Sequence, residues 1–147
     1  MSEKTIKLIV TAPQGNLYND ELEQITATTM LGEITILPNH IPLISILQSG
    51  ELIIQKDGKK IPFAVYGGFI EIKNNNEVII LADSAEHVDA IDEANVEAAA
   101  KKAEEILKEK FNTSDYEDAA LNLAREQARL RIVKKYKNQG IRTSHQN

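Results

Sequence analysis

Residues 32–44 read GEITILPNHIPLI, and in this stretch two β-branched runs flank a turn that lies between Pro38 and Pro42. β-Branched residues favour strands. Each proline fixes its own φ and removes a backbone donor, so the turn is stiff and cannot pair as part of a central strand. The stretch therefore predicts a strand over 34–37, a projecting turn, and a second strand over 41–47.

Short runs of the same kind continue on both sides of this stretch. Each run is rich in β-branched or aromatic residues, and turn-forming Gly, Pro, Asn or Asp residues separate one run from the next. The predicted strands lie at 4–10, 22–29, 34–37, 41–47, 52–55, 61–65, 69–73 and 78–82. About eight to ten short strands with no helix between them are typical of an antiparallel sandwich or barrel.

The composition changes near residue 88, where a helical pattern replaces the strand pattern. Beyond this point Ala, Glu and Lys dominate, and Gly and Pro are absent until Gly140. Either Asp89 or Asp92 is suited to cap a first helix over about 90–110, because a carboxylate accepts hydrogen bonds from the unpaired N–H groups of a helix N-terminus.

A break at 112–115 offers a new cap and leads into a second helix, which we expect to end near Lys137. The short connection predicts two antiparallel helices, and their many Ala residues bury little area each. We therefore expect the hairpin to be weakly stable by itself and easily detached. The predicted domains are a β-sandwich over 1–88, an α-helical hairpin over 89–137 and a disordered tail over 138–147.

The composition excludes several classes of protein. The chain has 147 residues, no Cys and a net charge of −5. Without Cys there is no disulfide scaffold, no Cys-based zinc site and no thiol catalysis, and an acidic chain is a poor candidate for binding nucleic acid. No apolar run approaches the ~20 residues of a membrane-spanning helix, and the N-terminus does not read as a secretory signal.

The charge is unevenly distributed over the helical part of the chain. Residues 89–110 carry four Lys against seven Asp and Glu, whereas residues 115–137 carry six Lys and Arg against four Asp and Glu. Two interpretations remain open: the acidic and basic segments pair side by side, or each presents ordinary solvated charges.

Motifs for catalysis are absent from the sequence. The three histidines, His40, His87 and His145, are far apart and have no partner at metal-ligand spacing. Gly67 and Gly68 lie between strand-like runs with no helix after them, so they do not form a phosphate-binding loop. No serine lies in a nucleophile-elbow pattern. These observations argue against an enzyme and against a metal site.

The turn between the two prolines has two interpretations. A stiff, projecting turn that carries the polar His40 beside the apolar Ile41 suits contact with a partner protein. Alternatively, it is an ordinary loop in which His40 hydrogen-bonds to a nearby carbonyl group. The residue pattern alone does not choose between them.

Residues 32–43 resemble a segment of the epsilon subunits of F-type ATP synthases, which reads Gly-Glu-(Leu/Ile)-Gly-Ile-Leu-Pro-Gly-His-(Ala/Ile)-Pro-Leu. The similarity continues in VYGGFIEI at 65–72, VIILADSA at 78–85 and IVTAPQGNLY at 9–18, and it covers the chain from residue 5 to about 137. The chain departs from the family at Thr35 and Asn39, where members often have Gly.

This resemblance implies a mainly β protein with an α appendage: an antiparallel ten-stranded β-sandwich followed by an antiparallel two-helix hairpin. It implies a non-catalytic rotor subunit, with no required cofactor, on the cytoplasmic face of the cell membrane as a peripheral part of the complex. The implied partners are the gamma subunit, the c-subunit ring and, when the hairpin is extended and restrains ATP hydrolysis, the alpha and beta subunits. The implied interface residues are Glu33, Pro38, His40, Ile41 and Pro42.

Some bacterial members of the family bind ATP as a regulatory ligand on the folded hairpin. The matching positions in this chain are Glu86, Ile91, Asp92, Arg125 and Arg129, and Asn95 replaces an arginine of those members. Loss of that arginine removes a charged donor for phosphate or ribose. The alternative is that Asp92 caps the helix and the two arginines are solvated.

A function from another class also remains open. The strands with a helical tail fit a stand-alone ligand-binding β-sandwich module, such as a small sugar- or peptide-binding domain. Co-purification distinguishes the two functions, because a rotor subunit comes out with the gamma subunit and a stand-alone module does not.

Overall fold

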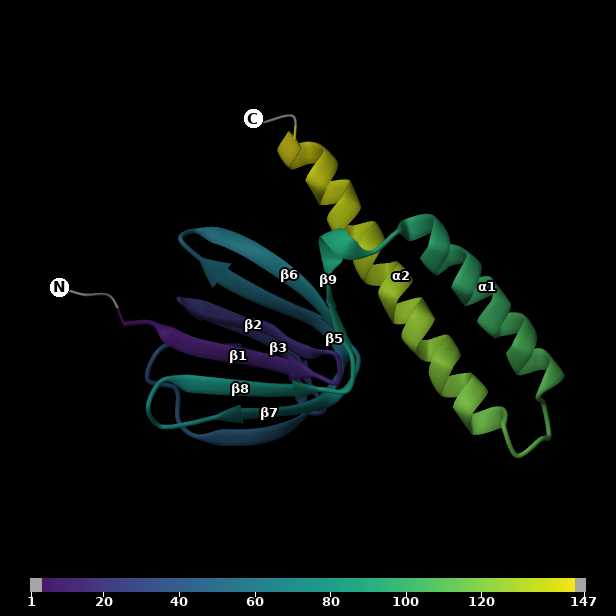
Figure 1. Cartoon of the computed structure of the whole chain (residues 1–147), viewed down its shortest axis with the longest axis horizontal. Helices are drawn as coiled ribbons and strands as arrows, with labels where there is room; N and C mark the ends of the chain where they lie inside the picture. The colour runs from purple at the N-terminus through teal and green to yellow at the C-terminus, as the bar shows by residue number, and fades with distance from the viewer. Residues whose placement is uncertain (1–3, 145–147) are drawn as a thin grey trace. The chain divides into compact units, whose positions relative to one another are not determined.

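The computed structural model describes residues 4–144 of the chain, with side chains described through residue 137. The chain divides into two compact units, Met1–His87 and Val88–Asn147. Among the described residues, the first unit contains nine strands and the second contains the helices (Figure 1). This division falls within one residue of the change in composition at residue 88.

The first unit is a β-sandwich whose strands follow one another closely along the chain. They are β1 (Ile6–Ala12), β2 (Gly15–Leu22), β3 (Gln24–Thr29), β4 (Gly32–Ile36), β5 (Leu43–Lys56), β6 (Lys59–Val65), β7 (Gly68–Ile72), β8 (Glu77–Ala82) and β9 (Ala85–His87). Neighbouring strands form the order β2-β1-β8-β7-β5-β3-β4, and β6 pairs with β5 and β9.

The long strand β5 joins the two layers of the sandwich. Its residues Leu43–Leu47 pair with β7, whereas Gly50–Lys56 pair with β6. One layer therefore holds β2, β1, β8, β7 and the start of β5, and the other holds β4, β3, the end of β5, β6 and β9. The sequence predicted two separate strands, 41–47 and 52–55, where the structure has the single strand β5. When β5 is counted once in each layer, the nine strands of the described residues become the ten that the resemblance implies.

The pairing of β1 with β8 is the main departure from an antiparallel sandwich. These two strands run parallel, whereas the seven other pairings in the described part of the chain are antiparallel. Parallel neighbours need a long connection between them. Here the connection is the chain from β2 to β7, which lies between β1 and β8 in the sequence.

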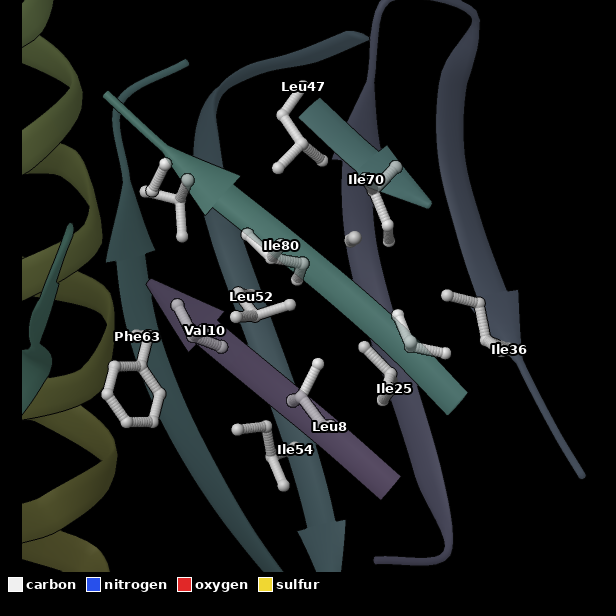
Figure 2. Close-up of a cluster of buried hydrophobic side chains, with 14 of the residues drawn as sticks. Leu8, Val10, Ile25, Ile36, Leu47, Leu52, Ile54, Phe63, Ile70 and Ile80 are labelled. Carbon is white, nitrogen blue, oxygen red and sulfur yellow. The ribbon is translucent and has the colours of Figure 1, made fainter. Parts of the chain in front are cut away.

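The core lies between the two layers. Along β1 the side chains of Ile6, Leu8 and Val10 are buried while Lys7 is exposed, which is the period-two pattern that the sequence predicts. Figure 2 shows Leu8, Val10, Ile70 and Ile80 facing Ile25, Leu52, Ile54 and Phe63 across this space. Among the described residues, the core cluster contains only side chains between Ile6 and Ala85, so the sandwich has a core of its own.

Gly68, at the start of β7, allows a close approach to β8. Its φ is +126°, and a Cβ atom there would lie 2.1 Å from the carbonyl oxygen of Leu81. We expect Gly68→Ala to lower the free energy of unfolding by about 2 kcal/mol, because the backbone must shift. Urea unfolding measures this loss.

Gly58→Ala is the matched control for that substitution. Gly58 also has a positive φ, +76°, but apart from Gly58 and its two chain neighbours no heavy atom of the described residues lies within 4 Å of the Cβ position. It should therefore show only the conformational cost of about 1 kcal/mol. Equal losses at the two positions would contradict the steric argument.

The second unit is a helical hairpin. A 3₁₀ turn (Val88–Ala90) leads into α1 (Glu93–Glu109), and α2 (Tyr116–Ser144) packs against α1 in the antiparallel arrangement seen in Figure 1. Few side chains are buried in the described part of the hairpin, and most of them are small or β-branched: Val96, Ala103, Ala128, Ile132 and Val133. Among the described residues, no helix combines the length and the apolar composition that crossing a membrane requires.

The second helix is longer than the sequence predicted. It continues through Ser144, whereas we expected it to end near Lys137 and a disordered tail to begin at residue 138. Each residue added to an existing helix gains a hydrogen bond, so Gly140 weakens the helix without ending it. Residues 145–147 of the predicted tail lie outside the described residues.

Candidate functional site

The turn between β4 and β5 spans residues 37–42 and is called the docking turn below. The backbone N–H of His40 donates to the carbonyl oxygen of Leu37 (3.2 Å). Pro38 occupies the second position of this turn, and Asn39 occupies the third with φ +69°. This is the residue pattern of a type II turn, in which the third position requires a positive φ. Asn39 therefore meets the requirement that glycine meets in the family.

The side chains of the docking turn are mixed in polarity and largely accessible. Leu37 and Ile41 are 54% and 75% exposed, and Pro42 is also exposed. His40 is half-buried, and its Nδ1 lies 2.6 Å from the carbonyl oxygen of Ile41. Because a carbonyl oxygen only accepts, Nδ1 is the donor in this bond. The hydrogen bond of the ordinary-loop interpretation is thus present, and docking by this turn stays a prediction.

Glu33 lies on β4, just before the docking turn. It is exposed and pairs in register with Thr28 of β3. Thr35, the other departure from the family pattern, is also within β4, where it pairs with Thr26 in extended conformation. A β-branched residue fits such a strand well, so the change from glycine causes no strain there.

An exposed apolar face of the sandwich was not predicted. The side chains of Ile44, Ile46, Phe69 and Leu81 are between 45% and 71% exposed. The register places Ile46 opposite Phe69, and Phe69 opposite Leu81, so they form a row across β5, β7 and β8. We call these four residues the apolar sheet face. Contiguous exposed apolar groups of this kind mark interaction sites.

The apolar sheet face is continuous with the docking turn, because β5 begins one residue after Pro42. A shallow depression of about 570 Å³ lies in this region, lined by residues 42–44 of the turn and β5 and by residues 71–75 of β7 and the turn that follows it. Glu71 and Lys73 place opposite charges on its wall. The turn, the depression and the sheet face thus form one surface.

A charged cluster lies elsewhere in the sandwich, on β2 and β5. Lys56 Nζ donates to Oδ2 of Asp20, and this hydrogen bond holds the pKa of Asp20 below its usual value and that of Lys56 above it. Burial raises the pKa of Tyr18, whose ring also contacts Phe63 edge-on. The carboxylate's contribution to stability is present at neutral pH and is lost as pH falls through the lowered pKa of Asp20. The cluster connects strands of the two layers and contains no predicted site residue.

In the hairpin, Asp92 is the N-cap of α1. Its Oδ1 accepts from the backbone N–H groups of Ala94 (3.0 Å) and Asn95 (3.4 Å), and its Oδ2 accepts from Nδ2 of Asn95 (3.3 Å). Both carboxylate oxygens are therefore engaged within the cap, as the capping interpretation predicted.

The two arginines lie one turn apart on α2, as predicted from their spacing. Arg129 forms an ion pair with Glu126 of the same helix (3.1 Å), and Arg125 is exposed. Glu126 is 8% exposed. The sequence did not predict this burial, because glutamate is almost never buried unless it has a partner. Between the helices, Glu97 pairs with Lys134 (3.5 Å), which supports the interpretation that acidic and basic segments meet.

The remaining predicted ATP-site residues are divided between the two units. Glu86 lies on β9 of the sandwich and accepts a hydrogen bond from the hydroxyl of Tyr66 (2.5 Å). Ile91 belongs to the hairpin unit and is buried. In the described structure Asp92, Arg129 and Glu86 all have protein partners, and ATP binding stays a prediction. The described residues also contain no group of three or more His, Asp or Glu side chains placed to hold a metal ion.

Replacing Asn95 with arginine tests the predicted ATP site. We expect Asn95→Arg to raise affinity for ATP about tenfold, because it restores one charged hydrogen bond worth ~1.5 kcal/mol. Arg129→Ala should abolish binding, whereas Arg131→Ala, an exposed arginine on the same helix, should not. Titration calorimetry on the intact chain measures all four proteins. Absence of heat at millimolar ATP in both the wild type and Asn95→Arg would show that the hairpin has no nucleotide site.

Comparison with known proteins identifies the family. The family described as "ATP synthase, Delta/Epsilon chain, beta-sandwich domain" matches residues 5–88. The ATP synthase epsilon chain of Herpetosiphon aurantiacus is 37% identical over 133 residues, which cover 90% of this chain and 97% of that one. That of Caldanaerobacter subterraneus is 40% identical over 135 residues, covering 91% and 97%.

A solved structure agrees at the level of the fold. In the Euglena gracilis mitochondrial ATP synthase, described as OSCP/F1/c-ring, one chain matches with a TM-score of 0.71 and 22% identity, covering 84% of this chain and 78% of that one. The matches to these two sequence relatives extend over nearly the whole length of each relative. The chain therefore belongs to the ATP synthase epsilon chain family, whose members are stalk subunits of the synthase and not its catalytic subunits.

Proposed function

We propose that this chain links the gamma subunit to the c-subunit ring in the rotor of an F-type ATP synthase. The observation that carries this proposal is the single surface made by the docking turn and the apolar sheet face, together with the exposed Glu33 on β4. A rotor subunit must bind two partners at once, and the sandwich offers an exposed apolar face on β5, β7 and β8 and an exposed carboxylate on β4 of the other layer. The proposed location of the chain is the cytoplasmic face of the membrane, where it would be a peripheral subunit of the complex.

The apolar sheet face and the carboxylate of Glu33 suit different partners. Apolar and aromatic groups supply most of the affinity at protein interfaces, so the apolar sheet face is the proposed site for gamma, with His40 at its edge. An exposed carboxylate such as Glu33 contributes specificity and association rate more than affinity. Glu33 is therefore the proposed contact to the polar loops of the c-subunit ring.

The hairpin is the proposed regulatory element, which restrains ATP hydrolysis when it extends toward the alpha and beta subunits. Two observations support this role. The hairpin is a compact unit by itself, and few of its described side chains are buried. An element with few contacts to exchange is able to take two arrangements of similar free energy.

Co-purification with the gamma subunit of the same organism tests the proposal. We expect gamma to retain the wild-type chain, whereas His40→Ala combined with Ile41→Asp should lower affinity at least about tenfold, since the charge replaces an apolar contact at the interface. Leu121→Asp is the control, because Leu121 is an exposed apolar residue of the hairpin (70%).

Circular dichroism checks that each variant keeps its fold. Unchanged affinity of the His40/Ile41 variant would reject the docking turn as a contact to gamma. A wild-type chain that purifies without gamma would instead favour the stand-alone ligand-binding module.

A further inference from the structure

Two asparagines tie the docking turn to the turn between β7 and β8. The backbone N–H of Asn39 donates to Oδ1 of Asn76 (2.5 Å), and Nδ2 of Asn76 lies 3.4 Å from Oδ1 of Asn39. Both residues have positive φ, +69° and +58°. Asparagine adopts this conformation more readily than most other residues. Each asparagine thus allows its own turn, and together they connect two turns that are 37 residues apart in the sequence.

Asn76 is itself anchored in the sheet. Its carbonyl oxygen accepts a hydrogen bond from the backbone N–H of Lys7 on β1 (2.8 Å). The backbone N–H of Lys73 donates to the carbonyl oxygen of Glu77 (2.8 Å), which closes the turn that contains Asn76. The side chain of Asn76 therefore projects from a fixed part of the sandwich onto the docking turn.

We infer that Asn76 is a positioning residue for docking: its side chain holds Asn39, and through it presents His40 and Ile41 in the orientation that the partner meets. This inference rests on the proposed function, and it deepens it by naming what orders the interface turn. The prolines restrict φ at two positions of this turn. The backbone of Asn39, His40 and Ile41 is not restricted in this way, so it would lose conformational freedom on binding unless another contact already orders it. A turn that is already ordered loses less conformational entropy on binding.

The test removes the side chain of Asn76 without changing the backbone requirement. Glycine adopts a positive φ at no steric cost, so Asn76→Gly keeps the turn and deletes the hydrogen bonds to Asn39. We expect ¹⁵N relaxation of the free chain to show increased motion at Asn39, His40 and Ile41. We also expect affinity for the gamma subunit to fall about fivefold, the effect of losing one hydrogen bond.

Two further variants separate positioning from general weakening. Asn76→Asp keeps an oxygen that accepts from the N–H of Asn39 and should restore both the order of the turn and most of the affinity. Asn75→Gly makes the same substitution at the exposed neighbouring residue and should change neither. Urea unfolding of all variants shows whether any loss of affinity follows from lower stability instead.

The two measurements distinguish failure of this inference from failure of the proposed function. Wild-type relaxation at residues 39–41 in Asn76→Gly would overturn the inference, as would increased motion with unchanged affinity. Absence of gamma binding by the wild-type chain would reject the proposed function and, with it, a docking role for Asn76. The relaxation result would still decide whether Asn76 orders the turn.

Discussion

Replacing Phe69 with aspartate is expected to weaken binding to the gamma subunit by more than a hundredfold while the sandwich stays folded. Phe69 lies in the middle of the apolar sheet face, between Ile46 and Leu81 in the register. Aromatic residues at the centre of an interface are the usual sites of large effects, about 2–4 kcal/mol on truncation. Aspartate adds the cost of placing an unpaired charge in a dehydrated contact, so we expect at least about 3 kcal/mol.

The fold should tolerate this substitution because the Phe69 side chain is 55% exposed and lies outside the core cluster. Phe111→Asp is the matched control: Phe111 is 66% exposed and belongs to the hairpin unit. Surface-immobilised gamma and each purified variant give the dissociation constants, and urea unfolding gives the stabilities. Equal affinities for the Phe69 and Phe111 variants would show that gamma does not use this face of the sheet.

Most of the strands that the sequence predicted have side chains that alternate between core and surface, although β6 was predicted too and ends in three consecutive buried residues. β1 and β8 follow this pattern and were found close to their predicted positions. β2 was missed because its residues GNLYNDEL are poor strand formers, with Leu22 its one buried side chain; pairing with β1 determines its conformation. The predicted break inside β5 was also wrong, because the strand bends from one layer to the other without ending.

The docking turn could be predicted because its two prolines and its positive-φ asparagine act through local geometry. The apolar sheet face could not, because alternation in β5 and β7 shows that a strand has two different faces but does not show which apolar side chains remain uncovered. Phe69 and Ile70 read alike in the sequence, yet Ile70 is fully buried and Phe69 is exposed. Similarly, the burial of Glu126 depends on its ion pair with Arg129, and a helical pattern assigns glutamate to the surface.

The Asn39–Asn76 contact depends on the parallel pairing of β1 with β8, which was also unpredicted. That pairing fixes the carbonyl group of Asn76 against β1, and so places the turn after β7. A sequence records that Asn39 tolerates a positive φ. The sequence does not show which distant side chain accepts a hydrogen bond from the backbone N–H of Asn39.

Removing residues 89–147 is expected to leave a folded sandwich that binds gamma with the affinity of the full chain and no longer restrains ATP hydrolysis. The core cluster ends at Ala85, and both parts of the proposed docking surface lie before residue 82. The truncated chain therefore keeps its core and its interface. Its cooperative unfolding by urea should persist, because the buried residues between the two layers remain.

The decisive measurement is the rate of ATP hydrolysis by a complex reconstituted with either the truncated or the full-length chain. We expect a severalfold higher rate with the truncated chain, since restraint requires the extended hairpin and the rotor connection does not. The truncated and full-length chains must bind gamma with equal affinity, because only then does a difference in hydrolysis rate measure the effect of the hairpin. A lower affinity would place part of the docking surface beyond residue 88, and an unchanged rate would assign the restraint to the sandwich. Loss of cooperative unfolding would show that the two units share one core, which the position of the core cluster argues against.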